Sequence, residues 1–155
     1  MGNCAHSTLC FGVLLAEGPQ PWDPDGRDPS GFRDWLSLIE GYQNPHEYPF
    51  AKAGGYKPGF STHSENTQAY FDYLKAWERD HPPAYQLCRS GTADTCQRVL
   101  ALANSVLETD WDQPLVLPRH FSPRDWRGNI LEAFCRAHGI HCVGPAAWYL
   151  LAYYG

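Results

Sequence analysis

The C-terminal stretch of the chain constrains the fold more than any other part of the sequence. It reads SPRDWRGNILEAFCRAHGIHCVGPAAWYLLAYYG over residues 122–155. Ser122 followed by Pro123 is typical of a helix start, and Gly139 is typical of a helix end. The expected apolar stripe of this helix consists of Trp126, Ile130, Phe134 and Ala137. The aromatic-rich run after Gly139 predicts a strand that lies within a sheet.

Other segments predict the remaining elements by their apolar spacing and turn residues. The apolar run TLCFGVLL predicts a buried strand. The Gly-Thr-Ala-Asp turn predicts that the strands before and after it form a hairpin. Helices are expected over residues 30–40 and from Thr62 or Ser64 to about residue 80. Strands are expected over residues 8–15, 84–90 and 96–103, with shorter ones near 105–109 and 114–117. Residues 42–62 have a loop composition.

This order of elements predicts an α+β fold. We expect residues 1–155 to form one domain, with an antiparallel or mixed sheet of about four strands and three helices packed on it. The C-terminal strand is expected inside the sheet.

The net charge of −5 comes from one part of the chain. Residues 17–47 hold seven acidic side chains against Arg27 and Arg33, and the rest of the chain is balanced. The acidic residues are Glu17, Asp23, Asp25, Asp28, Asp34, Glu40 and Glu47. This imbalance argues against direct binding of nucleic acid, which needs a basic face, and favours a surface for a basic protein partner. The plain alternative is a solvated acidic surface.

The N-terminal residues carry no recognisable export or membrane signal. The sequence MGNCAHSTLCFGVLL has no basic residues before its apolar run, which is too short for a signal peptide or a membrane span. We therefore expect a cytoplasmic protein that does not enter a membrane. Its six cysteines are then expected to remain thiols.

A cluster of potential metal ligands lies at the expected end of the C-terminal helix. Cys135, His138, His141 and Cys142 supply the thiolate and imidazole groups that zinc prefers. A cysteine beside an apolar helix stripe is also a common small core residue, and a second ligand cluster is lacking nearby. We therefore expect no cofactor, with zinc at these four residues as the alternative.

Two further patterns touch on enzymatic chemistry. His63-Ser64-Glu65 has the His-x-Glu form found in zinc deaminases, but the Pro-Cys-x2-Cys half of that signature is missing. The cysteines that follow are Cys88 and Cys96, which have seven residues between them and no proline before the first, so they do not fit that spacing. Cys96 is a possible nucleophile without a family signature around it. The sequence assigns no catalytic residue.

The two ends of the chain carry features that can be compared with a known group of proteins. They are CFGVLL with the Pro21-Trp22 turn after it, and the ending Gly144-Pro145-x2-Trp148-Tyr149-Leu150 followed by Tyr-x-Gly. This combination resembles small proteins of tailed phages and prophages. The resemblance implies a role in the host cytoplasm through binding of a host protein or defence complex.

In its most specific form, the implied protein is a counter-defence (anti-CRISPR-like) inhibitor that uses the acidic surface. The alternatives are a phage accessory interaction protein with another role, or a zinc- or cysteine-dependent enzyme such as a hydrolase or deaminase. The oligomeric state and the partner's identity stay open at this point.

Overall fold

The chain forms two compact units. The computed structural model describes residues 5–26, 31–41, 72, 75–77, 79–92, 96–110 and 113–154. Residues 31–83 form one unit, and residues 1–30 together with 84–155 form the other, which we call the sheet unit. The described strands are β1 (Ala5–Leu15), β2 (Tyr85–Thr92), β3 (Cys96–Leu102), β4 (Leu107–Asp110) and β5 (Cys142–Tyr154). The helices are α1 (Phe32–Ile39) and α3 (Asn129–Ala137), with short 3-10 turns η2 (Ala103–Ser105) and η3 (Pro123–Asp125).

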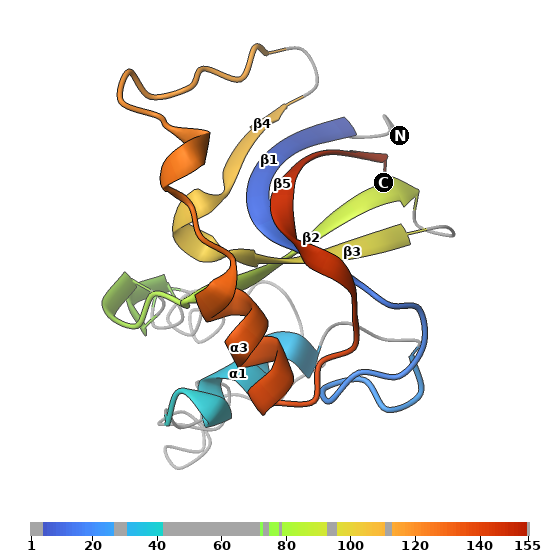
Figure 1. Ribbon diagram of the computed structural model, residues 1–155. Helices are drawn as coiled ribbons and strands as arrows, with labels where there is room; N and C mark the ends of the chain where they lie inside the picture. The colour runs from blue at the N-terminus through green and yellow to red at the C-terminus, as the bar shows by residue number, and fades with distance from the viewer. Residues whose placement is uncertain are drawn as a thin grey trace. The chain divides into compact units, whose positions relative to one another are not determined.

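The five strands make one mixed sheet that curls back on itself. Their order is β3-β2-β5-β1-β4, and β3 pairs with β1 as well, so the pairings among β1, β3, β2 and β5 form a ring. The ring closes where β2 meets β5 in a short parallel pairing at Gly91 and Thr92. Figure 1 shows β1 and β5 curving side by side. The predicted mixture of helices and a mixed sheet is confirmed, with five strands rather than about four.

Strand β1 bends at Gly12. Its first half pairs with β4 and its last part with β3, while β5 runs along its other edge. A Cβ atom at Gly12 would lie 2.5 Å from the carbonyl oxygen of Leu100 and 2.6 Å from a methyl carbon of Val99. The register with β5 also shifts between Gly12 and Leu14. Glycine therefore permits the close approach of β3 that lets the sheet curl.

The inner face of the curled sheet is the apolar core of the sheet unit. A buried cluster joins all four strands of the ring, since it consists of Cys10, Cys88, Val99, Ala101 and Leu151. Residues at paired positions of neighbouring strands share a face, as Cys88 and Val99 do. The predicted position of the C-terminal strand within the sheet is confirmed, because β5 contributes Leu151 to this core and lies between β2 and β1.

The helix before β5 begins later than predicted. Ser122 and Pro123 start the 3-10 turn η3 instead of the helix, and Trp126 is extended, with φ −87° and ψ 127°. The Trp126 ring packs against Phe11, with 5.9 Å between ring centroids, and against Trp148, with 5.5 Å. This aromatic contact accounts for the extended residue, and α3 starts only at Asn129.

The predicted apolar stripe of this helix was therefore wrong. The buried side chains of α3 are Leu131 and Cys135, whereas Ile130 is 65% exposed. Because Trp126 lies outside the helix, it does not set the buried face. The expected end of the helix is confirmed, since Gly139 follows it with φ +65°.

Most of the other predicted elements in the described residues are confirmed, and one predicted strand is wrong. The hairpin of β2 and β3 is confirmed as an antiparallel pair, and α1 ends before Gly41, which has φ +81°. Residues 114–117 do not form a strand, because Pro114 and Pro118 cannot donate to a sheet ladder. Helical residues occur at 75–77 and 79–80. The loop at 42–62 and the start of the second helix lie outside the described residues. Within the described chain, no helix combines the length and apolarity that crossing a membrane requires.

Candidate functional site

A tight turn after β1 forms the first wall of the candidate site. The backbones of Gln20 and Asp23 exchange two hydrogen bonds, of 3.0 and 2.9 Å, and the Gly26 N–H donates to the Asp23 carbonyl at 3.0 Å. Gly18 and Gly26 have φ of +100° and +68°. A Cβ atom at Gly26 would lie 2.8 Å from the carbonyl carbon of Gly18. The glycines therefore allow residues 16–26 to fold into a compact turn.

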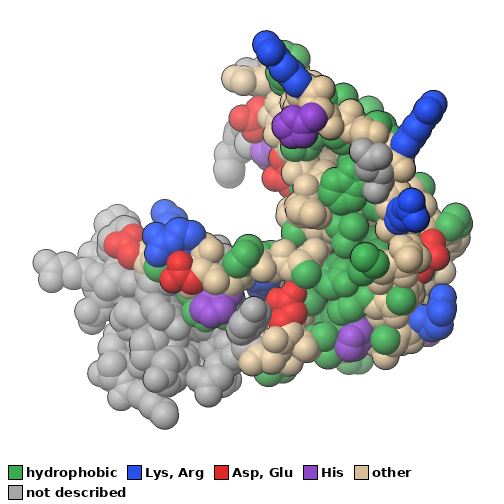
Figure 2. Space-filling view, turned by 60° about the vertical axis from the view of Figure 1, so that its left-hand side comes forward, with side chains coloured by type: hydrophobic (Ala, Val, Ile, Leu, Met, Phe, Trp, Pro, Cys, Tyr) green, Lys and Arg blue, Asp and Glu red, His purple; other side chains and the backbone are tan. Residues whose placement is uncertain are grey.

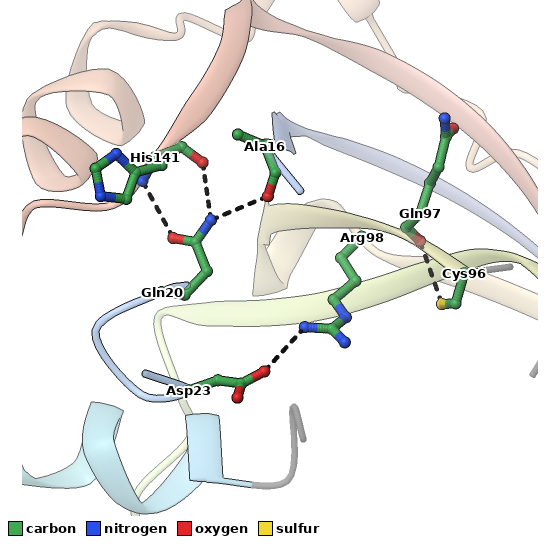
Figure 3. Close-up of polar contacts among 7 residues, drawn as sticks. All are labelled: Ala16, Gln20, Asp23, Cys96, Gln97, Arg98 and His141. Carbon is green, nitrogen blue, oxygen red and sulfur yellow. Dashed lines mark hydrogen bonds and ion pairs between the residues drawn. The ribbon is translucent and has the colours of Figure 1, made fainter. Parts of the chain in front are cut away.

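The Gln20 side chain fastens this turn to the connection between α3 and β5. Its amide nitrogen donates to the carbonyl oxygens of Ala16, at 3.2 Å, and of His141, at 3.0 Å. Its amide oxygen accepts from the His141 backbone N–H at 3.1 Å. Figure 3 shows these three bonds converging on the side chain. Because Gln20 is buried, the bonds satisfy polar groups that would otherwise be costly to bury.

A buried ion pair holds the other end of the turn. The Arg98 guanidinium of β3 donates to the Asp23 carboxylate at 3.4 Å, as drawn in Figure 3. The Asp23 side chain is only 4% exposed and that of Arg98 is 20% exposed. Removing one partner of such a pair leaves a charge without compensation, which is strongly destabilising. Asp23 therefore serves to position the turn.

A cleft of about 770 Å³ lies between this turn and the β2–β3 hairpin. Its walls are the end of β1 with residues 16–18, Gln20 and Gly26, the facing ends of β2 and β3, and Val143 of β5. The cleft has the size of a typical small-molecule or side-chain binding site. Its polar wall residues include Glu17, Ser90, Cys96, Gln97 and Arg98.

The thiol of Cys96 lies in the cleft wall without a histidine beside it. Its Sγ–H donates weakly to the Gln97 carbonyl oxygen at 3.4 Å. None of the described residues that line the cleft is a histidine. A cysteine nucleophile is normally activated by such a base, so the arrangement gives Cys96 no visible activation.

The acidic residues named from the sequence are distributed over both units. In the sheet unit, Glu17 and Asp25 are exposed on the turn beside the cleft, while Asp23 is buried. In the other unit, Asp34 in α1 and Glu40 at its end are half-buried. Asp28 and Glu47 lie outside the described residues. Among the described acidic residues, Glu17, Asp23 and Asp25 therefore share the turn, and Glu17 lines the cleft.

The candidate metal ligands do not converge in the described part of the chain. Among those residues, no three side chains of the His, Cys, Asp and Glu types are placed to hold a metal ion. Cys135 is buried on α3, whereas the His138 ring packs on Phe134 at 4.6 Å. His141 is exposed, and its backbone is the part that Gln20 holds. The deaminase-like residues 63–65 lie outside the description.

The other cysteine of that pattern, Cys88, is a core residue. It is buried with Cys10 on the inner face of the sheet. The interaction between the two thiols, together with burial, raises the pKa of Cys88, while the same interaction lowers the pKa of Cys10. Neither thiol is placed for chemistry on a substrate.

Hydrophobic side chains are also present on the surface. Val116, Ile130, Val143 and Leu150 are exposed. Figure 2 shows hydrophobic side chains gathered in a band on one face of the described chain. Val143 is the exposed apolar residue that also lines the cleft. The cleft therefore offers both apolar contact and charge.

Comparisons with protein-family models, with curated proteins and with solved structures found no match for this chain. The site is therefore interpreted from its own geometry. Sequence reasoning missed Gln20 and Arg98, which build it. Gln20 stands in a proline-rich turn, and its partner His141 is 121 residues away in the chain, so no local pattern marks it.

Proposed function

We propose that this protein acts by binding a host protein, and that a basic segment of the partner docks on the 16–26 turn and its cleft. The observation that carries the proposal is the position of two exposed carboxylates, Glu17 and Asp25, on a fixed turn beside a cleft of about 770 Å³. Glu17 itself lines the cleft. A lysine or arginine side chain that enters would have an apolar wall at Val143 and a carboxylate at the rim.

The charges around the cleft favour a cation over an anion. Arg98 is paired with Asp23, so Glu17 is the other charged residue that lines the cleft. Among the described residues of the 16–26 turn, the carboxylates outside this pair are those of Glu17 and Asp25. Neither carboxylate has an ion-pair partner among the described residues. An electrostatically complementary partner would be steered toward this surface, and the effect would weaken as salt is added.

The fixed backbone of the turn supports a role in binding. Gln20 and the Asp23–Arg98 pair hold it at both ends, so little conformational entropy would be lost when a partner docks.

In its finer form, the proposal names the partner as a host defence complex and the protein as a phage-encoded counter-defence (anti-CRISPR-like) inhibitor. The acidic segment supports this form, because proteins that handle nucleic acid expose basic surfaces that an acidic inhibitor can cover. The resemblance of both chain ends to phage and prophage proteins supports it too.

The test compares two charge reversals of equal size. Glu17→Lys with Asp25→Lys changes the rim of the cleft, and Glu108→Lys with Asp110→Lys changes exposed acids on β4. Asp23 stays unchanged, because its replacement would break the buried pair. After affinity capture from host lysate identifies the partner, the dissociation constant is measured for each variant at low and at physiological salt.

We expect the rim variant to bind on the order of tenfold or more weakly at low salt, with a smaller salt dependence, and the β4 variant to bind like the wild type. Equal affinities for all three proteins would contradict the acidic-rim proposal. Thermal melting of both variants checks that the loss is not caused by unfolding.

A further inference from the structure

The segment between β4 and η3 carries an exposed apolar tip. Figure 1 shows this segment, residues 113–121, projecting from the sheet, and we call it the arm. Val116 is 79% exposed and Leu117 is 46% exposed. Pro114 and Pro118 stand on either side of them and fix the backbone φ at their own positions. The arm therefore presents its apolar tip in a restricted conformation.

Both ends of the arm are held by hydrogen bonds. At its start, the Gln113 N–H donates to the Asp110 carbonyl at 3.1 Å, and the Thr109 hydroxyl donates to the Gln113 carbonyl at 3.2 Å. At its end, the Phe121 N–H donates to the Pro118 carbonyl at 2.9 Å. The exposed tip is therefore a fixed feature of the folded chain.

Three half-buried aromatic rings lie where the arm returns to β5. The Trp148 ring contacts Phe121, with 4.9 Å between ring centroids, and Trp126, with 5.5 Å. Its indole N–H donates to the Pro123 carbonyl at 3.2 Å. The exposed Leu150 shares a face of β5 with Trp148, because alternate residues of a strand point to the same side. These contacts join the arm, η3 and β5 into one surface.

Exposed arginines alternate with these rings along the chain. Arg119 precedes Phe121 by two residues, and Arg124 and Arg127 stand on either side of Trp126. None of the three arginines forms an ion pair with another described residue. The contacts of the rings with β5 bring these arginines to the same part of the surface. Figure 2 shows Lys and Arg side chains spaced along a band of hydrophobic side chains on one face.

The charge of this region is opposite to that of the acidic segment. Residues 113–154 contain four arginines but only two acids, Asp125 and Glu132, so this stretch is positive although the whole chain carries −5. The Glu132 carboxylate is already engaged, since it accepts from the Ala146 backbone N–H at 3.0 Å. A negatively charged partner therefore complements this face.

We propose that this face is a peripheral membrane-binding site for an anionic phospholipid surface. The tip with Val116 and Leu117 enters the boundary between headgroups and acyl chains, and the aromatic rings lie at the level of the headgroups. The arginines bind the lipid phosphates. The protein lies on the membrane surface in this arrangement and does not span it. None of these residues lines the cleft, so the site is additional to the one proposed for a host protein.

The exposed aliphatic side chains favour a lipid surface over a single-stranded nucleic acid. Arginines and aromatic rings are also the groups that bind phosphates and stack on bases. The Trp148 ring, however, meets both Phe121 and Trp126 edge to face, which leaves less ring surface for bases. Stacking on bases also gives no role to Val116 and Leu117, whereas their transfer from water into lipid is favourable.

The test is flotation of the full-length, folded protein with phospholipid vesicles. One set of vesicles contains phosphatidylcholine alone, and the other contains phosphatidylcholine and phosphatidylglycerol in equal amounts. Val116→Gln with Leu117→Gln removes the apolar tip without changing the charge. The matched control is Leu38→Gln with Ile39→Gln, an adjacent apolar pair of α1 that is 66% and 40% exposed.

A second pair of variants tests the charge. Arg124→Gln with Arg127→Gln removes two arginines of the proposed site. Lys75→Gln with Arg89→Gln removes two exposed cations elsewhere and changes the net charge equally. Thermal melting of all four variants checks that they are folded.

We expect the wild type to float with the anionic vesicles and not with the neutral ones, and to dissociate as salt is added. The tip variant should partition on the order of tenfold more weakly, because apolar area is no longer buried in lipid. The arginine variant should also lose on the order of tenfold, since each cation near the surface adds to binding. Both control variants should float like the wild type.

Several results would overturn the proposal. They are a wild type that floats with neither set of vesicles, equal flotation with both sets, and a tip variant that floats like the wild type. A labelled single-stranded DNA oligonucleotide gives the remaining comparison. If the wild type and the tip variant bind it equally, the arginine variant does not, and none of them floats, the face belongs to nucleic acid and the lipid proposal is wrong. The wild-type flotation does not depend on the folding of any variant.

Discussion

At the scale of single residues, the Ser105 side chain supplies a hydrogen-bond acceptor at a point where the pairing of β1 with its neighbours is interrupted. It lies in η2, where the partner of β1 changes from β4 to β3. Its hydroxyl oxygen accepts from the Phe11 backbone N–H at 2.9 Å, and the hydroxyl donates to the Leu102 carbonyl at 2.6 Å. One buried side chain thus satisfies a backbone donor that faces no strand at that point.

Replacement of Ser105 by alanine should therefore be costly. The Phe11 N–H would be left buried without its acceptor, and we expect the free energy of unfolding to fall by about 1–3 kcal/mol. Urea denaturation measures this loss. Ser90→Ala is the matched control, since the Ser90 hydroxyl bonds at the exposed edge to Ala152 at 3.4 Å. A similar loss in both variants would contradict this account of Ser105.

At the scale of elements, β5 unites the sheet unit. It pairs with β1 over most of its length and closes the ring by its short contact with β2. Its alternate residues face different surroundings, because Leu151 is 6% exposed and belongs to the core cluster while Leu150 is 75% exposed. The buried face of β5, which carries Leu151, therefore holds this strand in the sheet.

A pair of neighbouring substitutions tests this division. We expect Leu151→Ala to lower the free energy of unfolding by about 2–5 kcal/mol, because it removes buried apolar contact and leaves a cavity. Leu150→Ala should change it by no more than about 0.5 kcal/mol. Chemical denaturation of both variants gives the comparison, and equal losses would mean that the register of β5 is wrong.

At the scale of the whole molecule, the buried thiols link stability to pH. Burial, together with the neighbouring Cys142 thiol, raises the pKa of Cys135 to about 12. In the unfolded chain a cysteine has a pKa of about 8.5. Between these two values the unfolded state binds fewer protons than the folded state, so stability must fall as the pH rises.

We therefore expect the free energy of unfolding to decrease from about pH 8.5 toward pH 12, with a contribution from Cys135 of up to about 1.4 kcal/mol per pH unit. Denaturant titrations in reducing buffer from pH 7 to 10.5 measure the slope. Cys135→Ala should flatten it, whereas Cys96→Ala serves as the control and should not. An unchanged slope in Cys135→Ala would refute the assignment.

The elements with a strong local pattern were the ones that could be predicted. The apolar run at 8–15, the two hairpin strands and the glycine after α1 each carry their own signal, and each appears in the structure. The error at residues 122–128 has a tertiary cause. Trp126 packs on Phe11, which is more than a hundred residues away, and this contact overrides the local helix signal.

The residues of the candidate site could likewise be predicted only in part. The acidic segment was visible in the sequence, and it supplied Glu17 and Asp25. The burial of Asp23 was not visible, because its partner Arg98 comes from another strand. The cleft itself exists only where the turn after β1 meets the hairpin of β2 and β3.

The sequence by itself determined the mixture of helices and strands, the excess of acid near the N-terminus and the strand at the C-terminus, because composition and periodicity are local properties. Only the tertiary structure decided that the sheet curls at Gly12 and that Gln20 and Arg98 fix a turn. Each of these depends on contacts between segments distant in the chain, whose geometry no local pattern encodes.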